Sequence, residues 1–338
     1  MPDSSNEIKN SKDGVRLSVV LACLGGRDSI ATTVAALRRQ TVADQVQLLF
    51  VYAKGSEIAA DHHDLHDFAS VKVVSIDSAT SIARANAAGI RAATSPVVAL
   101  AEDHSFPDPG WAESLIKAHE QHWAAVGPAV RNANPATAVS WADFFIGYGP
   151  WAEPISAGTV DFLPGHNSSY KRAVLLEYEG GLEDMLEAET ILHWELRKKG
   201  HELYLEPNAK TSHANFSLLS SWVHAQFFGG WVFGGSRVLT MSMFQQLVYF
   251  AGAPLIPFVR FARICRHIMR AKNSDCPIVR LLPVLFFGLA IDGVGQMLGY
   301  AMGVRSSKKK LAHLEYHRIE HVTAADREML KKGEYSGR

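Results

Sequence analysis

The fold is decided by the stretch Pro96-Val97-Val98-Ala99-Leu100-Ala101-Glu102-Asp103-His104. Its first six residues form a short apolar run, which is typical of a strand buried on both faces of a sheet. Open α/β folds bind ligands at the carboxyl ends of their strands, so Glu102, Asp103 and His104 form a candidate site. Carboxylate oxygens with one imidazole suit Mg²⁺ or Mn²⁺, and an ordinary solvated loop is the alternative interpretation.

Upstream of this stretch, strand and helix patterns alternate. Apolar runs predict strands at residues 17–22, 46–52 and 71–76, and an alanine-rich segment predicts a helix at 81–93. Such alternation predicts an α/β fold with a mixed, mostly parallel sheet that has helices on both faces. The ends of the first two strands, near Ala22 and Ala53, should therefore lie at the same sheet edge as Glu102.

Downstream, the chain changes character. A strand is predicted to run into a turn at residues 160–167, and a helix at 187–199 is closed by Gly200. Glu189 falls in the first turn of that helix, where the dipole favours a carboxylate; this stabilising role is the alternative to a catalytic one. A short strand at 202–206 is followed by His213.

The last hundred residues contain a long apolar segment, from Leu281 to Val304. It is long enough to span a bilayer, but basic residues flank it on both sides, which disfavours a single crossing. The sequence predicts a pair of shallow, membrane-associated helices bent near Asp292-Gly293, with a soluble packing or dimer helix pair as the alternative. The basic run at 260–272 is predicted to face anionic lipid headgroups, and a solvated helix face is its alternative.

Composition limits the classes of function. The 338 residues are 47% hydrophobic and 20% charged, which is typical of a globular chain. A formal net charge of zero gives no field that would point to nucleic acid, so no nucleic-acid partner is predicted. Three cysteines without metal-type spacing and a polar amino terminus predict a cytoplasmic location. The expected division is a flexible tail at 1–14, a catalytic domain at 15–240, a membrane-associated helical segment at 241–304 and a basic polar tail at 305–338.

The order of the motifs resembles the inverting glycosyltransferases of family 2, which have the GT-A fold. The resemblance covers Leu17 to Arg237. The motifs that carry it are Leu17-Ser18-Val19-Val20-Leu21, Ala83-Arg84-Ala85-Asn86-Ala87-Ala88-Gly89, Glu102-Asp103-His104, Leu163-Pro164-Gly165-His166-Asn167, Glu187-Ala188-Glu189 and His213. Each motif alone is weak, but six in this order are fairly specific.

This resemblance implies the roles of particular residues. It implies that Glu189 is the catalytic base, and that Asn167 and Glu187 lie on the acceptor side. It implies metal binding by Asp103, His104 and His213. The residues that it places around the cofactor, a nucleotide-diphosphate sugar with Mg²⁺ or Mn²⁺, are Ala22, Ala53, Arg84, Asn86, Glu102 and Asp103.

The function expected from the resemblance is inverting transfer of a sugar to a lipid-linked or polysaccharide acceptor at the cytoplasmic face of the cell membrane. The protein would be peripheral or monotopic there, would contact membrane lipids, and could form a homo-oligomer. Two departures leave alternatives open: Glu102 and His104 replace the usual aspartates, and Ala53-Lys54 stands where the family has an aspartate that helps to hold the base. These favour a non-catalytic GT-A-fold binding or assembly subunit, while a nucleotidyltransferase is disfavoured because no glycine- and lysine-rich phosphate loop is found.

Overall fold

The computed structural model describes residues 7–9, 14–23, 27–54, 65–77, 81–187, 189–238, 241–271 and 276–335. The chain divides into two compact units. The first unit comprises residues 1–131 and 153–212, and the second comprises 132–152 and 213–338. These limits differ from the domain boundaries expected at residues 14, 240 and 304, which stay predictions.

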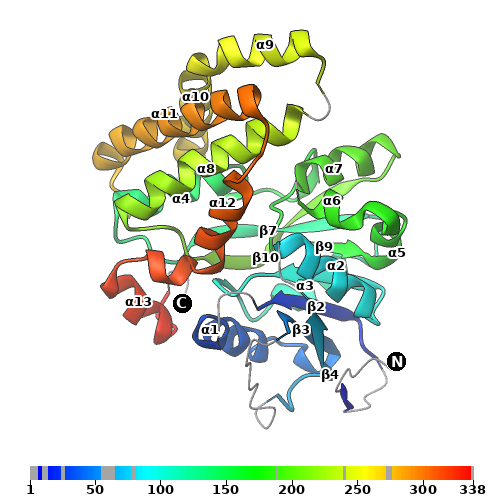
Figure 1. Ribbon diagram of the computed structural model, residues 1–338. Coiled ribbons are helices and arrows are strands. Elements are labelled where there is room, and N and C mark those ends of the chain that lie inside the picture. The colour runs from blue at the N-terminus through cyan, green and yellow to red at the C-terminus, as the bar shows by residue number, and fades with distance from the viewer. Residues whose placement is uncertain are drawn as a thin grey trace. The chain divides into compact units, whose positions relative to one another are not determined.

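A mixed sheet forms the centre of the first unit (Figure 1). Its strands are β1 (Glu7–Lys9), β2 (Leu17–Ala22), β3 (Val46–Ala53), β4 (Ser70–Ile76), β5 (Val97–Ala101), β6 (Ser105–Pro107), β7 (Ala125–Asn132), β8 (Gly158–Val160), β9 (Ser169–Lys171) and β10 (Leu203–His213). Among the described residues the order is β1-β4-β3-β2-β5-β9-β7-β10-β6, and β8 pairs with β10. Strands β4, β3, β2 and β5 are parallel, whereas β9 is antiparallel to both β5 and β7. The predicted mixed, mostly parallel sheet is confirmed.

Helices cover both faces of this sheet, as predicted. Those of the first unit are α1 (Arg27–Arg38), α2 (Ile82–Ala92), α3 (Trp111–Ala118), α5 (Arg172–Leu176), α6 (Leu182–Leu186) and α7 (Glu189–Lys198), with 3₁₀ turns η1 (Ala43–Gln45) and η4 (Glu179–Gly181). All six residues of β2 are buried. Val19 and its alternate neighbours belong to a core cluster with residues of α1 and α3, while Val20 faces α2, where a Cβ on Gly89 would lie 2.3 Å from it. The strand therefore alternates between two apolar layers.

The second unit is mainly helical. Its elements are α4 (Ala138–Tyr148), η3 (Gly149–Trp151), α8 (Leu219–Val238), α9 (Met243–Gly252), η5 (Ala253–Leu255), α10 (Ile256–Ala271), α11 (Ile278–Met302), α12 (Ser307–Tyr316), η6 (Arg318–His321) and α13 (Ala324–Lys331). Residues 305–335, expected to be a polar tail, thus form three helical segments, in which Val322 and Leu330 are buried.

The expected helix pair bent near Asp292-Gly293 is wrong, because α11 is one continuous helix through these residues. Helix α8 packs along it (Figure 1), with glycines on both helices at the contact. Asp292 does not break the helix, since its carboxylate pairs with Arg260 at 2.5 Å and accepts a hydrogen bond from Gln296 at 2.7 Å. A buried charge with such partners is tolerated inside a helical core.

Two helical segments of the described chain are long and apolar enough to cross a membrane by length and composition, Met243–Ala271 and Ile278–Met302. In Met243–Ala271, 17% of the most apolar 18-residue stretch is buried, whereas in Ile278–Met302 the buried share of such a stretch is 39%. The segment that precedes the expected one is therefore the more exposed of the two.

Candidate active site

The predicted metal loop is a tight turn between β5 and β6. The backbone N–H of Ser105 donates to the carbonyl of Glu102, 3.3 Å away, which closes the turn. Glu102 and His104 are almost fully buried, and Glu102 Oε2 lies 3.4 Å from His104 Nε2. The other ring nitrogen, Nδ1, lies 2.8 Å from Asp103 Oδ1. The turn thus holds a carboxylate and an imidazole facing each other, with a second carboxylate that orients the imidazole.

A second turn, at residues 164–168, runs beside the end of β5. Leu100 donates its backbone N–H to Ser168, and Asn167 donates its own to Leu100 at 2.6 Å. Asn167 adopts the left-handed conformation, with φ of 59°, which asparagine tolerates better than most residues. These contacts bring His166 to Glu102, with 3.1 Å between Nδ1 and Oε1.

Glu189 lies against this second turn. It lies in the first turn of α7, as predicted, and its carboxylate occupies the space beside Gly165: a Cβ there would lie 2.8 and 2.9 Å from the two carboxylate oxygens. The charge of Glu189 also adds to the effect of burial in raising the pKa of Tyr170 above its usual value. Glu189 therefore approaches the same turn that contacts Glu102.

His193, four residues after Glu189 in α7, is a buried, neutral histidine. His193 Nε2 lies 2.9 Å from the Tyr170 hydroxyl, and burial lowers the pKa of His193 to about 4. Glu187, the second carboxylate expected here, is half-buried in the turn before α7, and Ala188 lies outside the described residues.

The expected nucleotide-side residues lie on separate elements of the first unit. Ala22 ends β2, and Cys23 next to it has a pKa raised by burial and by the charge of Asp103, so this strand end faces the metal loop. Ala53 ends β3, while Arg84 and Asn86 lie on α2. The side-chain oxygen of Asn86 is buried without a hydrogen-bond partner among the described residues. Lys54 is described and pairs with Asp77, whereas Gly55 and Ser56 lie outside the described residues.

The strand expected at residues 202–206 is longer than predicted, since β10 runs through His213 as its last residue. Two residues earlier, Thr211 Oγ1 lies 2.8 Å from Ser105 Oγ, which also accepts a hydrogen bond from Asn167 at 2.7 Å. His213 itself belongs to the second unit, where its ring lies 4.4 Å from that of Tyr148.

The sequence reasoning missed His166, Ser105 and Thr211 as members of the site. His166 stands inside a quoted motif, and an imidazole after Pro-Gly in a turn was a usable signal. The two hydroxyls carried no signal, because serine and threonine at the start and end of strands are common.

The model of Glycosyl transferase family 2 matches residues 18–178, which include the Glu102 and Asn167 turns. Among solved structures, that of S. aureus TarS 1–349 in complex with UDP is 14% identical and aligns over 84% of this chain and 90% of that one, with a TM-score of 0.45. The structure of GalNAc-T7 with UDP, GalNAc and Mn²⁺ is also 14% identical, over 59% of this chain and 43% of that one, with a TM-score of 0.44. No curated protein matches the chain. Residues 18–178 belong to glycosyltransferase family 2, and the protein is a glycosyltransferase.

Proposed function

We propose that the protein transfers a sugar, with inversion, from a nucleotide-diphosphate sugar to a glycan or lipid-linked acceptor, and that Glu189 is the base. One observation carries this proposal: the turn at residues 164–168 contacts Glu189 at Gly165 and Glu102 at His166. The carboxylate proposed as the base and a carboxylate suited to a metal therefore flank one turn. Inverting transfer needs both, because the acceptor attacks from the face opposite the leaving diphosphate.

In this proposal Glu102 and His104 would hold a divalent ion, because Glu102 Oε2 and His104 Nε2 lie 3.4 Å apart and both are donor atoms that such ions accept. Asp103, predicted as a ligand, is assigned here to orient His104 through Nδ1. When bound, the ion would supply positive charge to the leaving diphosphate.

His213 is proposed as a further ligand, because it offers the same kind of donor atom and follows the loop-contacting Thr211 by two residues in β10. The metal would be Mg²⁺ or Mn²⁺, since oxygen donors with imidazole suit both.

Glu189 would accept the proton of the acceptor hydroxyl while that oxygen attacks the anomeric carbon. The carbon–oxygen bond to the diphosphate breaks in the same step, and the diphosphate leaves with the bonding electrons. A positioned base of this kind contributes typically ~10²–10⁴-fold. Asn167 and Glu187 remain acceptor-side predictions. Ala22, Ala53, Arg84 and Asn86 remain nucleotide-side predictions, of which the buried unpartnered oxygen of Asn86 offers an acceptor.

The test compares two glutamates of α7. Glu189→Gln should lower transfer by ~10²–10⁴-fold while metal-dependent binding of the donor persists. Glu195→Gln, near the other end of the same helix, is the matched control and should keep most of the activity. Transfer at the wild-type rate in Glu189→Gln would contradict the proposed base. Metal-independent or absent binding of every nucleotide sugar, measured by calorimetry with Mn²⁺ and with chelator, would favour the non-catalytic assembly subunit.

We also propose that the second unit binds the cytoplasmic face of a membrane through α9 and α10. These helices expose large apolar side chains, among them Phe244 and Leu247 of α9. Helix α9 also lines a groove of about 500 Å³, together with Tyr300 and Ala301 of α11. Arg263, Arg266 and Arg270 are exposed on α10. Basic side chains near an anionic leaflet contribute ~1 kcal/mol each, so the surface suits anionic lipid.

Flotation with vesicles tests this second proposal. Phe244→Ser with Leu247→Ser should reduce binding to anionic vesicles, whereas Trp194→Ser, which changes an exposed apolar side chain of the first unit, should not. Equal flotation of all three proteins, or none with the wild type, would contradict membrane binding by this surface.

A further inference from the structure

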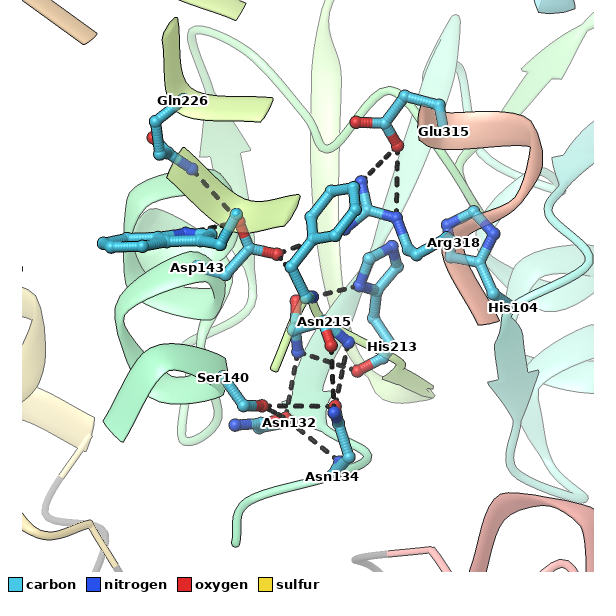
Figure 2. A network of polar contacts seen from close by, with 12 residues as sticks. His104, Asn132, Asn134, Ser140, Asp143, His213, Asn215, Gln226, Glu315 and Arg318 are labelled. Carbon is cyan, nitrogen blue, oxygen red and sulfur yellow. Dashed lines mark hydrogen bonds and ion pairs between the residues drawn. The ribbon is translucent and has the colours of Figure 1, made fainter. Parts of the chain in front are cut away.

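A chain of buried amides leads to His213 in the second unit (Figure 2). We call these residues the asparagine cluster: they are Asn132, Asn134 and Asn215, and each is at most 2% exposed. Asn132 ends β7, and Asn215 follows His213 by two residues. The orientation of each amide can be deduced from one backbone group.

The starting point is the backbone N–H of Asn134, which can only donate a hydrogen bond. It lies 3.1 Å from one side-chain atom of Asn132, so that atom must be the carbonyl oxygen Oδ1. The hydroxyl of Ser140 donates to the same oxygen from 3.1 Å. The Asn132 amide is therefore fixed by a donor that has no alternative role.

The orientation of Asn215 follows from that of Asn132. Its side-chain nitrogen lies 2.9 Å from Asn132 Oδ1 and 2.9 Å from the backbone carbonyl of His213, which are both acceptors. Asn134 holds the main chain of Asn215 as well, by accepting from its N–H at 2.8 Å and donating to its carbonyl at 2.9 Å. With its NH₂ group committed, Asn215 must turn its oxygen away from Asn132.

That oxygen lies 3.0 Å from Nδ1 of His213. Because an amide oxygen only accepts, Nδ1 must carry the proton, and the neutral ring then has its lone pair on Nε2. A lone pair on the outer nitrogen is what a metal-ligating histidine needs, and a fixed hydrogen bond to the other nitrogen is the usual way of securing it.

We propose that Asn215 is a positioning residue that holds His213 as the Nδ1–H tautomer and thereby presents Nε2 as a ligand for a divalent ion. This rests on the proposed function for the ligand role, but the tautomer does not depend on it. Asn132 and Asn134 act one step further out, by fixing the direction of the Asn215 amide.

The first measurement is nitrogen NMR of the full, metal-free protein labelled with ¹⁵N-histidine. The resonances of His213 are identified by their loss in His213→Gln. We expect a protonated Nδ1 and an unprotonated Nε2 above the pKa of the ring. A proton on Nε2 in the wild-type protein would overturn the proposal without requiring any variant of Asn215 to fold.

The second measurement is the affinity for Mn²⁺ alone, from electron paramagnetic resonance of the free ion. Asn215→Leu removes the acceptor and should weaken Mn²⁺ binding ~10–100-fold. Ser140→Ala is the matched control: it removes a donor to Asn132 Oδ1, but the backbone N–H of Asn134 still fixes that amide, so tautomer and affinity should be unchanged.

The outcomes separate the two proposals. An unchanged Mn²⁺ affinity in a folded Asn215→Leu protein would overturn the positioning role. Absence of Mn²⁺ binding in the wild type would overturn the metal site of the proposed function and the ligand role of His213. The tautomer would then still be decided by the NMR measurement.

Discussion

The two units of the protein differ in the side chains that they bring to their surfaces. The first unit brings polar and charged side chains to the carboxyl ends of its strands, where Glu102, His104 and Glu189 gather around two turns. The second unit carries every exposed large hydrophobic side chain of the described residues except Phe162 and Trp194. Soluble monomeric surfaces rarely carry apolar patches of this extent, which supports the proposal that the second unit, and not the first, binds an apolar partner.

Two glycines, one in each unit, differ in the group that occupies the space beside them. Gly165 in the first unit leaves room for the carboxylate of Glu189, which is the movable end of a side chain. Gly295 in α11 leaves room for the backbone of α8, since a Cβ there would lie 2.1 Å from the carbonyl oxygen of Phe227. One glycine therefore makes space for a functional group, and the other allows two helices to touch.

The largest effect is expected from Gly165→Ala. The new methyl group would overlap the Glu189 carboxylate and displace it, and a misplacement of about 1 Å can cost ~10²-fold in rate. We expect the rate of transfer to fall by that order while the melting temperature and donor binding change little. Steady-state transfer assays with a melting curve measure both.

Gly110→Ala is the control for this change, because a Cβ on Gly110 meets no atom within 4 Å. Adding Gly165→Ala to Glu189→Gln should cause little further loss, since the displaced group is already removed. If the loss of rate in the double variant is the product of the losses in the two single variants, Gly165 affects transfer through a group other than Glu189. The proposal that Gly165 leaves room for the catalytic carboxylate would then be wrong.

A smaller effect, on stability alone, is expected from Gly295→Ala. The methyl group would meet backbone, which cannot turn aside as a side chain can, so α8 and α11 must separate at a cost of ~1–3 kcal/mol. Urea unfolding should show this loss, while the first unit keeps its affinity for the nucleotide sugar.

Gly229→Ala tests whether the effect belongs to the contact. Gly229 lies in α8, but a Cβ there meets nothing within 4 Å, so this change should stabilise the helix by up to ~1 kcal/mol. Equal destabilisation by both substitutions would show that the helices are not packed as described.

The parts of the fold that the sequence predicted are those that depend on local pattern. The apolar runs at β2, β3, β4 and β5 were correctly predicted because strands buried on both faces need continuous apolar residues. The place of Glu189 in the first turn of α7 and the end of that helix before Gly200, with φ of 87°, were also predicted, because both follow from helix-end chemistry.

What could not be predicted depends on partners distant in sequence. Asp292-Gly293 suggested a bend in the apolar segment, but Arg260 neutralises Asp292. Gly288, Gly295 and Gly299 face α8, so α11 continues through the segment. His166 could not be joined to Glu102 from sequence because the antiparallel insertion of β9 beside β5 creates that contact. The asparagine cluster was missed because Asn132 and Asn134 contact Asn215, which lies about 80 residues later in the sequence.

The two units are also expected to differ in how their stability depends on pH. In the first unit, burial lowers the pKa of His119 and of His193 from 6.5 to about 4. Between these values the unfolded chain binds more protons than the folded one, so stability is complete above pH 6.5 and is lost as the pH falls towards 4, by at most ~1.4 kcal/mol per pH unit for each histidine. His119→Gln should therefore make the unfolding free energy less sensitive to acid between pH 6.5 and 4.

Asp143 in the second unit should act with the opposite sign. Burial outweighs its ion pair with Arg318 and raises its pKa from 3.8 to about 6, so between these values the folded state holds the extra proton and stability falls as the pH rises. Asp143→Asn removes this opposing contribution, and urea unfolding from pH 7 to pH 4 should then show a steeper loss than in the wild type. A shallower loss would mean that pairing with Arg318 outweighs burial. The two units would then respond to acid in the same direction, because protonation of His119, His193 and Asp143 would in each case destabilise the folded state.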